Sequence, residues 1–428
     1  MSKDSFSHDM DKIVVHGGHR LRGSVKISGS KNSALPILAA TLLTKETCTI
    51  SRVPDLSDIH YMLTILSELG CEVERASGVV QIRAEKISTQ APYDIVRKMR
   101  ASVCVLGPLL GREGEATVSL PGGCVIGDRP IDLHLRGFEA LGAAVRVSGG
   151  DVKVLAPHLK GATISLRSKF GSTVLGTGNV MMAAVLADGV TIIDGAAEEP
   201  EVVDLANFLI AMGAKIDGAG TRKITIEGVK ELHGAEHEVI PDRIEAGTFL
   251  VAGAISGDDV TISRVNPAHL RAVSDPLRDA GFDIQANGSE ISIKPGKIRR
   301  PLKLDTLPYP AFPTDMQAQM CALLATTDGI SVVTENVFPH RFMHVAELKR
   351  MGANIDLQGA TAVITGVPRL SGAPVMASDL RASAALVLAG LQSEGHTEVN
   401  RVYHIDRGYE SIDEKLNGLG AHIERRKA

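Results

Sequence analysis

Residues 138–147 read FEALGAAVRV: an apolar stretch runs up to Leu-Gly and then resumes as an alternating run. A glycine just past a helix commonly takes the left-handed conformation that ends it, and strict alternation is typical of a half-buried strand. The stretch therefore predicts a helix that stops beside Gly142 and turns directly into a β-strand.

The same pattern recurs five more times along the 428 residues. The other copies are LSELGCEVE at Gly70, FLIAMGAKI at Gly213, PLRDAGFDI at Gly281, LKRMGANIDL at Gly352 and KLNGLGAHIE at Gly420. Successive glycines of the six are 72, 71, 68, 71 and 68 residues apart. A fixed period of this kind indicates that one structural unit is repeated six times.

A second element recurs once in each unit, as a helix rich in small and aliphatic residues. Most copies are followed by a short β-type run such as CTISRV or VTIIDG. The predicted helices occupy residues 31–43, 99–111, 177–189, 243–256, 314–329 and 380–395. They are apolar on nearly every face, so we expect them to be buried. Each unit then reads β-α-β-α-β-β, and six units in two groups of three predict an α/β protein of two similar domains.

Composition narrows the function. Hydrophobic residues make up 44% and charged residues 22%, as in ordinary globular proteins, and no window is long and apolar enough for a membrane span. The polar start, residues 1–12, does not resemble a secretory signal, and five cysteines without framework spacing argue against a secreted disulfide protein. We therefore expect a cytoplasmic protein.

Two kinds of partner are also not expected. The chain has no CxxC, HExxH or Cys/His cluster in its sequence, so we predict no metal site. A net charge of −4 without a Lys/Arg run, together with 3% aromatic residues, argues against nucleic acid.

The starts of the buried helices carry charged residues in matching positions, among them Lys31, Arg100, Asp315 and Arg381. Unpaired N–H groups at a helix start favour anions, and an added Lys or Arg strengthens that preference. For any single helix, an acidic residue there is explained as an N-cap and a basic residue as a solvated flank. The repeated placement favours an anion-binding cleft.

Three residues are candidates for chemistry, each with a plainer explanation. Cys124 lies in SLPGGCVIGDRP (119–130), a glycine- and proline-bounded loop in which Arg129 would favour the thiolate; the alternative is an incidental loop thiol. Asp315, after Pro313, is a candidate general base or an N-cap. Asn32 could orient a polar substrate group or cap its helix.

At these residues the chain resembles the enolpyruvyl transferase family, in the branch that acts on UDP-N-acetylglucosamine. The resemblance runs from about residue 12 to the C-terminus. Its most specific carriers are SGSKNSALPILAATLL (28–43), LPGGCVIGDRPIDLHLRGFEALGA (120–143), FPTDMQAQ (312–319), DLRASAALVLAGL (379–391) and YHIDRGYE (403–410).

The resemblance implies a two-lobed inverted α/β barrel built from the six repeats, three per lobe. It places residues 1–30 and 240–428 in a first, discontinuous lobe and residues 31–239 in a second lobe that carries the Cys124 loop. The implied activity is transfer of the enolpyruvyl group of phosphoenolpyruvate to the 3′-hydroxyl of UDP-N-acetylglucosamine with release of phosphate, at the first committed step of peptidoglycan precursor synthesis.

The resemblance also implies roles for individual residues. Cys124 matches the proton donor to phosphoenolpyruvate and the predicted site of covalent inhibition by fosfomycin. Asp315 matches the residue that hydrogen-bonds the sugar hydroxyl. The phosphate-binding cations correspond to Lys31, Arg129 and Arg407. The remaining substrate contacts correspond to Asn32, Arg100, Pro130, Ile131, Asp132, Leu133, Val337, Arg341 and Arg381. No cofactor is implied.

One stretch departs from the family pattern. Residues 165–184, SLRSKFGSTVLGTGNVMMAA, are longer and differently composed than the loop that usually contacts the nucleotide. Alignment from one side assigns that role to Thr173 and Val174, and alignment from the other to Lys169 and Phe170. This difference keeps open an enolpyruvyl transferase that uses another uridine nucleotide. A non-catalytic nucleotide-sugar-binding relative is a separate alternative.

Overall fold

The computed structural model describes residues 11–91, 93–96, 99–120, 131–168, 171–296 and 299–427. Its described residues divide into two compact units. Unit 1 contains residues 11–28 and 241–427, and unit 2 contains residues 29–120 and 131–240. Each unit has its own hydrophobic core. Among the described residues, unit 2 is inserted between the two segments that make up unit 1.

Two backbone hydrogen bonds mark the places where the chain passes from one unit to the other. In unit 1 the amide of Asp242 donates to the carbonyl of Ser28 over 3.0 Å. In unit 2 the amide of Ser30 donates to the carbonyl of Ile240 over 2.7 Å. The outgoing and returning passages are therefore tied together within each unit.

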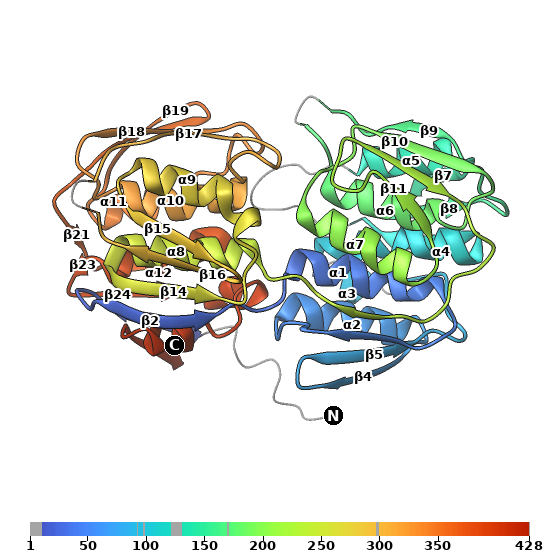
Figure 1. Cartoon of the computed structure of the whole chain (residues 1–428), viewed down its shortest axis with the longest axis horizontal. Helices are drawn as coiled ribbons and strands as arrows, with labels where there is room; N and C mark the ends of the chain where they lie inside the picture. Colours follow the sequence, from blue (N-terminus) through green and yellow to red (C-terminus); the bar gives the residue numbers. More distant parts are fainter. Residues whose placement is uncertain are drawn as a thin grey trace. The chain divides into compact units, whose positions relative to one another are not determined.

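Three four-stranded sheets form the outer layer of unit 1 (Figure 1), with a two-stranded pair, β21 (Leu370–Ser371) and β23 (Ser393–Glu394). In hydrogen-bonded order the sheets are β22 (Pro374–Met376), β24 (His396–Asn400), β1 (Asp11–His16) and β25 (His422–Lys427); β2 (Leu21–Lys26), β14 (Gly257–Ser263), β16 (Glu290–Lys294) and β15 (Asp283–Asn287); and β17 (Lys303–Thr306), β18 (Ile330–Glu335), β20 (Thr361–Thr365) and β19 (Asn354–Gln358).

Unit 2 has the same kind of outer layer. Its sheets, in order, are β13 (Glu236–Glu238), β3 (Cys48–Ser51), β5 (Val79–Arg83) and β4 (Glu72–Ala76); β9 (Thr163–Ser165), β10 (Val190–Asp194), β12 (Lys223–Glu227) and β11 (Lys215–Asp217); and β6 (Glu115–Ser119), β8 (Asp151–Leu155) and β7 (Ala144–Ser148).

All six of these described sheets share one hydrogen-bonding pattern. In five of them, one outer strand pairs in parallel with its neighbour and the next two pairings are antiparallel. In the sixth, a parallel bridge between Gln90 and Thr117 takes the place of the outer strand beside β6. The strand pairing is therefore similar in all six described sheets.

Six buried helices fill the two cores, three in each. They are α1 (Lys31–Ala40), α4 (Leu106–Glu113) and α6 (Val174–Ala184) in unit 2, and α8 (Arg243–Ser256), α10 (Gln317–Leu324) and α12 (Leu380–Leu391) in unit 1. The three of unit 1 contact one another, as Figure 1 shows for α8, α10 and α12. Every residue of α10 is buried, and every residue of α8 except Arg243. The prediction of helices without a solvent face is confirmed for these two, whereas α4 ends in the exposed Glu113.

The other six helices end at the repeated glycines. They are α2 (Ser57–Glu68), α5 (Asp132–Ala140), α7 (Pro200–Ala211), α9 (Arg271–Asp279), α11 (Met343–Arg350) and α13 (Ile412–Gly418). The glycine after each has a φ between 91° and 104°. At Gly142, its amide donates to the carbonyl of Glu139 and the next amide, of Ala143, to that of Phe138, which is the Schellman arrangement. All six copies repeat it, as the sequence predicts.

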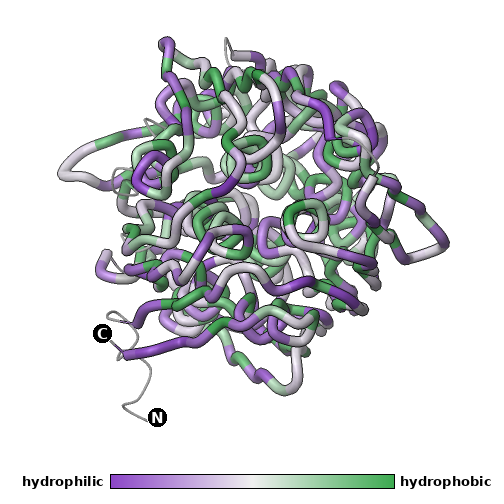
Figure 2. The backbone as a smooth tube through the Cα atoms, turned by 90° about the vertical axis from the view of Figure 1, so that its left-hand side faces the viewer, coloured by the Kyte–Doolittle hydropathy of each residue, from purple (hydrophilic) through white to green (hydrophobic). Residues whose placement is uncertain are grey.

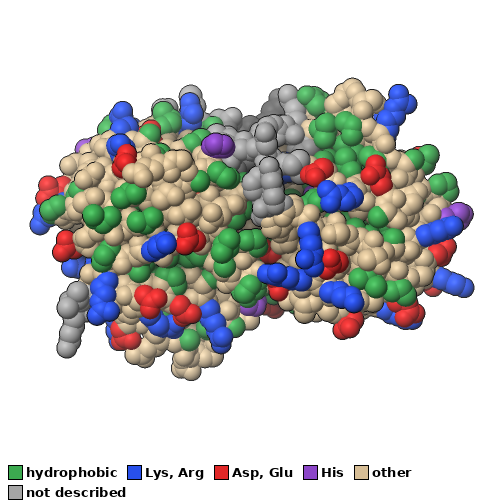
Figure 3. Space-filling model, turned by 90° about the horizontal axis from the view of Figure 1, so that it is seen from above, with side chains coloured by type: hydrophobic (Ala, Val, Ile, Leu, Met, Phe, Trp, Pro, Cys, Tyr) green, Lys and Arg blue, Asp and Glu red, His purple; other side chains and the backbone are tan. Residues whose placement is uncertain are grey.

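Short helical segments complete the described structure: α3 (Tyr93–Val96), η2 (Thr41–Leu43), η3 (Arg100–Val105), η4 (Pro267–Leu270), η5 (Thr314–Met316) and η6 (Val402–Arg407). In Figure 2, which faces unit 1, hydrophobic and hydrophilic segments alternate along the chain. On the face in Figure 3, basic and acidic side chains are interspersed. None of the described helices has the length and apolar character needed to cross a membrane.

Candidate functional site

Lys31 is the first residue of α1, directly after the N-cap Ser30. Its ammonium nitrogen lies 3.0 Å from a carboxylate oxygen of Asp58, in the first turn of α2. The side chains of Lys31 and Asp58 are only 11% and 3% exposed, so the pair fixes a cation at the start of a buried helix. A cation held there adds to the anion preference of the helix terminus.

Other predicted residues of unit 2 lie at the starts of neighbouring elements. Asn32 borders a small cavity that Val174 and Glu201 also line. Arg100 opens η3, which leads into α4. Asp132 begins α5, with Ile131 before it and Leu133, which is buried, after it. Thr173 caps α6 by accepting a hydrogen bond from the amide of Gly176.

A buried polar node in unit 2 holds these helix starts together. The Asn179 amide group donates to the carbonyl of Val103 over 2.8 Å and contacts Nδ1 of His134 at 3.0 Å, and its oxygen accepts from the amide of Gly107 over 2.7 Å. Burial, and secondly the charge of Arg100, lower the pKa of His134 to about 3. His134 is therefore neutral at ordinary pH and can accept this bond.

Unit 1 brings three of the predicted residues together. One oxygen of Asp315 lies 2.7 Å from Nη1 of Arg341, and the other lies 3.0 Å from Nη2 of Arg381. The two arginine side chains are 7% and 3% exposed, whereas that of Asp315 is 26% exposed. The Asp315 carboxylate is thus bound by an arginine at each oxygen and remains partly exposed at the surface of its unit.

The interpretation of Asp315 as an N-cap is wrong. The caps of η5 and α10 are Pro313 and Met316, and neither makes a side-chain capping bond. Asp242 and Asp379 are N-caps instead: their side chains accept amide hydrogen bonds at the starts of α8 and α12. The side chain of Asp315 is therefore available for a role other than capping.

The arginines around Asp315 have their own supports. Burial lowers the pKa of Arg381, but the nearby acidic groups, led by Asp315, together raise that pKa above its ordinary value, so this guanidinium stays charged. Its central carbon lies 5.3 Å from the ring centre of Tyr409. Burial raises the pKa of Tyr409, whose hydroxyl lies 2.9 Å from that of Thr248. The cluster is held in place by packing and by hydrogen bonds.

Two further predicted residues of unit 1 lie in turns. Val337 follows β18, and its amide donates to Glu335 over 2.9 Å, so only its carbonyl and side chain are left for a ligand. Arg407 ends η6 and is half-buried. Burial, followed by the charge of Arg407, lowers the pKa of His404.

Cys124, Arg129 and Pro130 lie outside the described residues. The four described cysteines are free thiols and buried. Burial raises the pKa of Cys48 to about 11 and those of Cys71 and Cys104 to about 12, and it also raises that of Cys321. A thiolate is the reactive form, so burial disfavours reaction at these four cysteines.

Sequence reasoning missed the residues that support the site. Thr314 accepts from Arg341 over 3.0 Å and donates to Glu335 over 2.9 Å, which links the arginine to the end of β18. Asn179 was detectable as the one amide in the apolar run GNVMMAA. Glu335 carries no comparable signal, because a glutamate at a strand end is usually solvated.

The chain belongs to the family of EPSP synthase (3-phosphoshikimate 1-carboxyvinyltransferase), whose model matches residues 15–416. Within that family it is 60% identical to a UDP-N-acetylglucosamine 1-carboxyvinyltransferase of Akkermansia muciniphila, over 97% of this chain and 99% of that protein. It is 58% identical to one of Methylacidiphilum infernorum, again over 97% and 99%. The enolpyruvyl transferase NikO from Streptomyces tendae superposes with a TM-score of 0.87 at 25% identity, covering 98% of this chain and all of NikO.

Proposed function

We propose that this protein transfers the enolpyruvyl group of phosphoenolpyruvate to the 3′-hydroxyl of UDP-N-acetylglucosamine, at the first committed step of peptidoglycan precursor synthesis. The observation that carries the proposal is the 60% identity, over almost the whole of both chains, with a relative of that name. The hydroxyl oxygen bonds to carbon 2 of phosphoenolpyruvate while carbon 3 takes a proton. Phosphate then leaves with its bonding electrons, and carbon 3 gives up a proton.

The reaction places two anionic substrates beside each other, which demands cations. In the proposal, Lys31, Arg129 and Arg407 bind phosphate, and Asn32 and Arg100 orient the substrates. Residues 129–133, Val337, Arg341 and Arg381 contribute to the nucleotide-sugar site. Positive groups already in place stabilise developing charge without having to reorganise during the reaction. The buried, paired state of Lys31, Arg341 and Arg381 supports this role.

Asp315 accepts the hydrogen bond of the sugar hydroxyl and serves as general base, and Cys124 is the general acid. Two arginines orient the Asp315 carboxylate and leave it partly exposed, which suits a group that must meet a substrate hydroxyl.

The finer architecture is also part of the proposal: an inverted α/β barrel in each lobe, three β-α-β-α-β-β repeats per lobe, with residues 1–30 and 240–428 in one and 31–239 in the other. The common pattern of the six sheets and the six Schellman turns support a sixfold repeat. Cytoplasmic location, without nucleic-acid or membrane partners, completes the assignment.

One observation also supports a different acceptor substrate. NikO, which is titled an enolpyruvyl transferase, matches the fold closely at only 25% identity, so this fold is compatible with a diverged acceptor site. The alternative is transfer to a different uridine nucleotide.

Phosphate release tests both possibilities. The purified protein should release phosphate when given phosphoenolpyruvate and UDP-N-acetylglucosamine, and should not when shikimate 3-phosphate replaces the nucleotide sugar. Fosfomycin should abolish the activity and add its mass to the peptide that contains Cys124. Phosphate release only with another uridine nucleotide would establish the alternative, and an adduct on any other cysteine would refute the role of Cys124.

A further inference from the structure

Three histidines form a row across one sheet of unit 1, away from the residues discussed above. His16, at the end of β1, is paired directly with His396 on β24 and with His422 on β25. Residues paired directly across neighbouring strands point to the same face of a sheet. The row therefore lies on one face, and it is not the core face, because the alternate residues Ile13 and Val15 belong to the core.

A carboxylate joins two of these rings. Glu424 lies two residues after His422 on β25, so its side chain points to the same face. Its Oε1 atom is 3.3 Å from Nε2 of His16 and 3.5 Å from Nε2 of His422. The rings of the two histidines stack, with centroids 4.2 Å apart and planes 18° apart.

The spacing of these atoms fits a small metal ion. The ligand atoms of His16, His422 and Glu424 all lie within 4.8 Å of one another. Zinc–nitrogen and zinc–oxygen bonds of about 2.1 Å in a tetrahedron place neighbouring ligand atoms about 3.4 Å apart. Two of the three distances, 3.3 and 3.5 Å, are already close to that length, and the third is at most 4.8 Å.

Nε2 of His16 is shielded from solvent, and its partner among the described residues is Oε1 of Glu424 at 3.3 Å. This contact does not meet the geometry of a good hydrogen bond. A metal ion at the meeting point of the three ligand atoms would bind the nitrogen and the carboxylate together.

We propose that His16, His422 and Glu424 bind one divalent transition-metal ion of the zinc class. Two imidazoles and one carboxylate are ligands that zinc uses with a fourth position open, whereas magnesium and calcium require oxygen ligands. The fourth position falls to water or to His19, whose ring centre is 5.6 Å from that of His422. His19 follows the glycine pair 17–18, is exposed and lies outside the strands.

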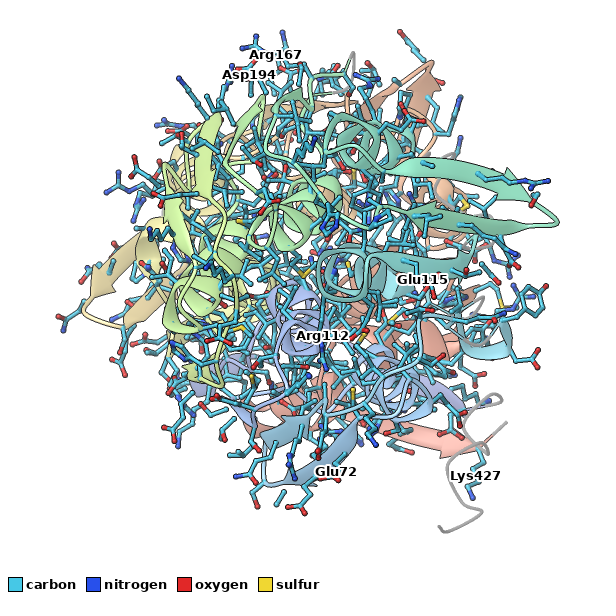
Figure 4. All side chains as sticks on the ribbon, turned by 90° about the vertical axis from the view of Figure 1, so that its right-hand side faces the viewer. Glu72, Arg112, Glu115, Arg167, Asp194 and Lys427 are labelled. Atoms are coloured by element: carbon cyan, nitrogen blue, oxygen red, sulfur yellow. The ribbon has the colours of Figure 1, made fainter. Side chains whose placement is uncertain are left out.

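The ion would connect the first and last strands of the chain. β1 and β25 run side by side (Figure 2), and β25 ends at Lys427, labelled in Figure 4. An ion that binds only the folded protein stabilises it in proportion to the logarithm of its concentration over the dissociation constant. Zinc should therefore raise the melting temperature of unit 1 and hold β1 and β25 together.

The test is zinc titration by calorimetry of the full-length, chelator-stripped protein and two variants. His422→Ala removes a ligand and should weaken binding at this site by about tenfold or more. His396→Ala removes the third histidine of the same row, which is not a ligand, and should bind zinc as the wild type does. Melting temperatures measured without metal establish that both variants are folded.

Crystals soaked in zinc give the second readout. Anomalous scattering should place one ion between His16, His422 and Glu424, and it should be missing in Glu424→Gln. Equal zinc affinity of the wild type and His422→Ala would overturn the proposal, as would anomalous density only at cysteines.

Discussion

At the scale of single residues, charge and burial separate the groups that hold the structure from those that face a ligand. Arg381 and Lys31 are buried in ion pairs, whereas Asp315 is gripped by two cations and still partly exposed. Arg167 and Asp194 form an ordinary surface pair, bonded at 2.9 and 3.0 Å and visible at the edge of Figure 4. The two kinds of pair predict different responses to mutation.

Asp315→Asn should lower kcat by about a hundredfold or more, because an amide cannot take the proton of the attacking hydroxyl. Steady-state phosphate release with phosphoenolpyruvate and UDP-N-acetylglucosamine measures it. Asp194→Asn is the control, since it neutralises an Asp–Arg pair that the proposal leaves outside the site, and its kcat should stay close to that of the wild type. An unchanged kcat in Asp315→Asn would exclude the general-base role.

The sequence predicted the positions of site residues best where those residues stand at the start of a helix. Lys31, Arg100 and Arg381 stand next to recognisable helix starts, and the structure finds them there. The grip of Arg341 on Asp315 joins residues 26 positions apart through a turn, which no local pattern encodes. The expectation of no metal site rested on contiguous motifs, whereas the cluster of His16, His422 and Glu424 is assembled by strand pairing between the chain ends.

At the scale of elements, the repeated turn after each outer helix sets the architecture. Gly352 follows α11 with a φ of 91°, and a Cβ added there would meet nothing within 4 Å. Only backbone conformation therefore requires glycine at this position. The six helix ends could be predicted from the sequence because a glycine that follows an apolar stretch is a local signal of a left-handed turn.

Gly352→Ala should destabilise unit 1 by about 1 kcal/mol, through left-handed strain alone. Gly418→Ala is the matched control: this glycine lies within α13 and is also open to an added Cβ, but its φ is not positive. It should be neutral or stabilise the protein by up to about 1 kcal/mol, because alanine favours a helix. Melting temperatures of the two variants must differ in this direction, and equal values would contradict the conformational explanation.

At the scale of the whole molecule, the buried carboxylate of Glu245 binds the backbone at Ser28, the last residue of unit 1 before the chain enters unit 2. Glu245 of α8 accepts from the amide of Ser28 over 2.9 Å and lies 2.5 Å from the ammonium of Lys415. Burial raises the pKa of Glu245 from 4.5 to about 7, although Lys415 opposes the shift. Between those two values the folded protein holds a proton that the unfolded chain releases.

The stabilisation that comes from protonated Glu245 is therefore fully present below about pH 4.5 and is lost as the pH rises to about 7. The melting temperature of the wild type, relative to Glu245→Gln, should fall between pH 5 and pH 7.5, since glutamine cannot ionise. Differential scanning calorimetry at several pH values measures this difference. The same comparison with Glu290→Gln, an exposed residue of unit 1, should give no such trend, and a constant difference for Glu245 would disprove the shift.

The backbone hydrogen bonds between Ser28 and Asp242 and between Ser30 and Ile240 show that the two ends of unit 2 lie next to each other. This arrangement has a consequence for protein engineering. A stretch whose two ends emerge next to each other can be excised, transplanted or circularly permuted without stretching what remains. Unit 2 meets this condition. If it were deleted, a linker of a few glycines could join residue 28 to residue 242.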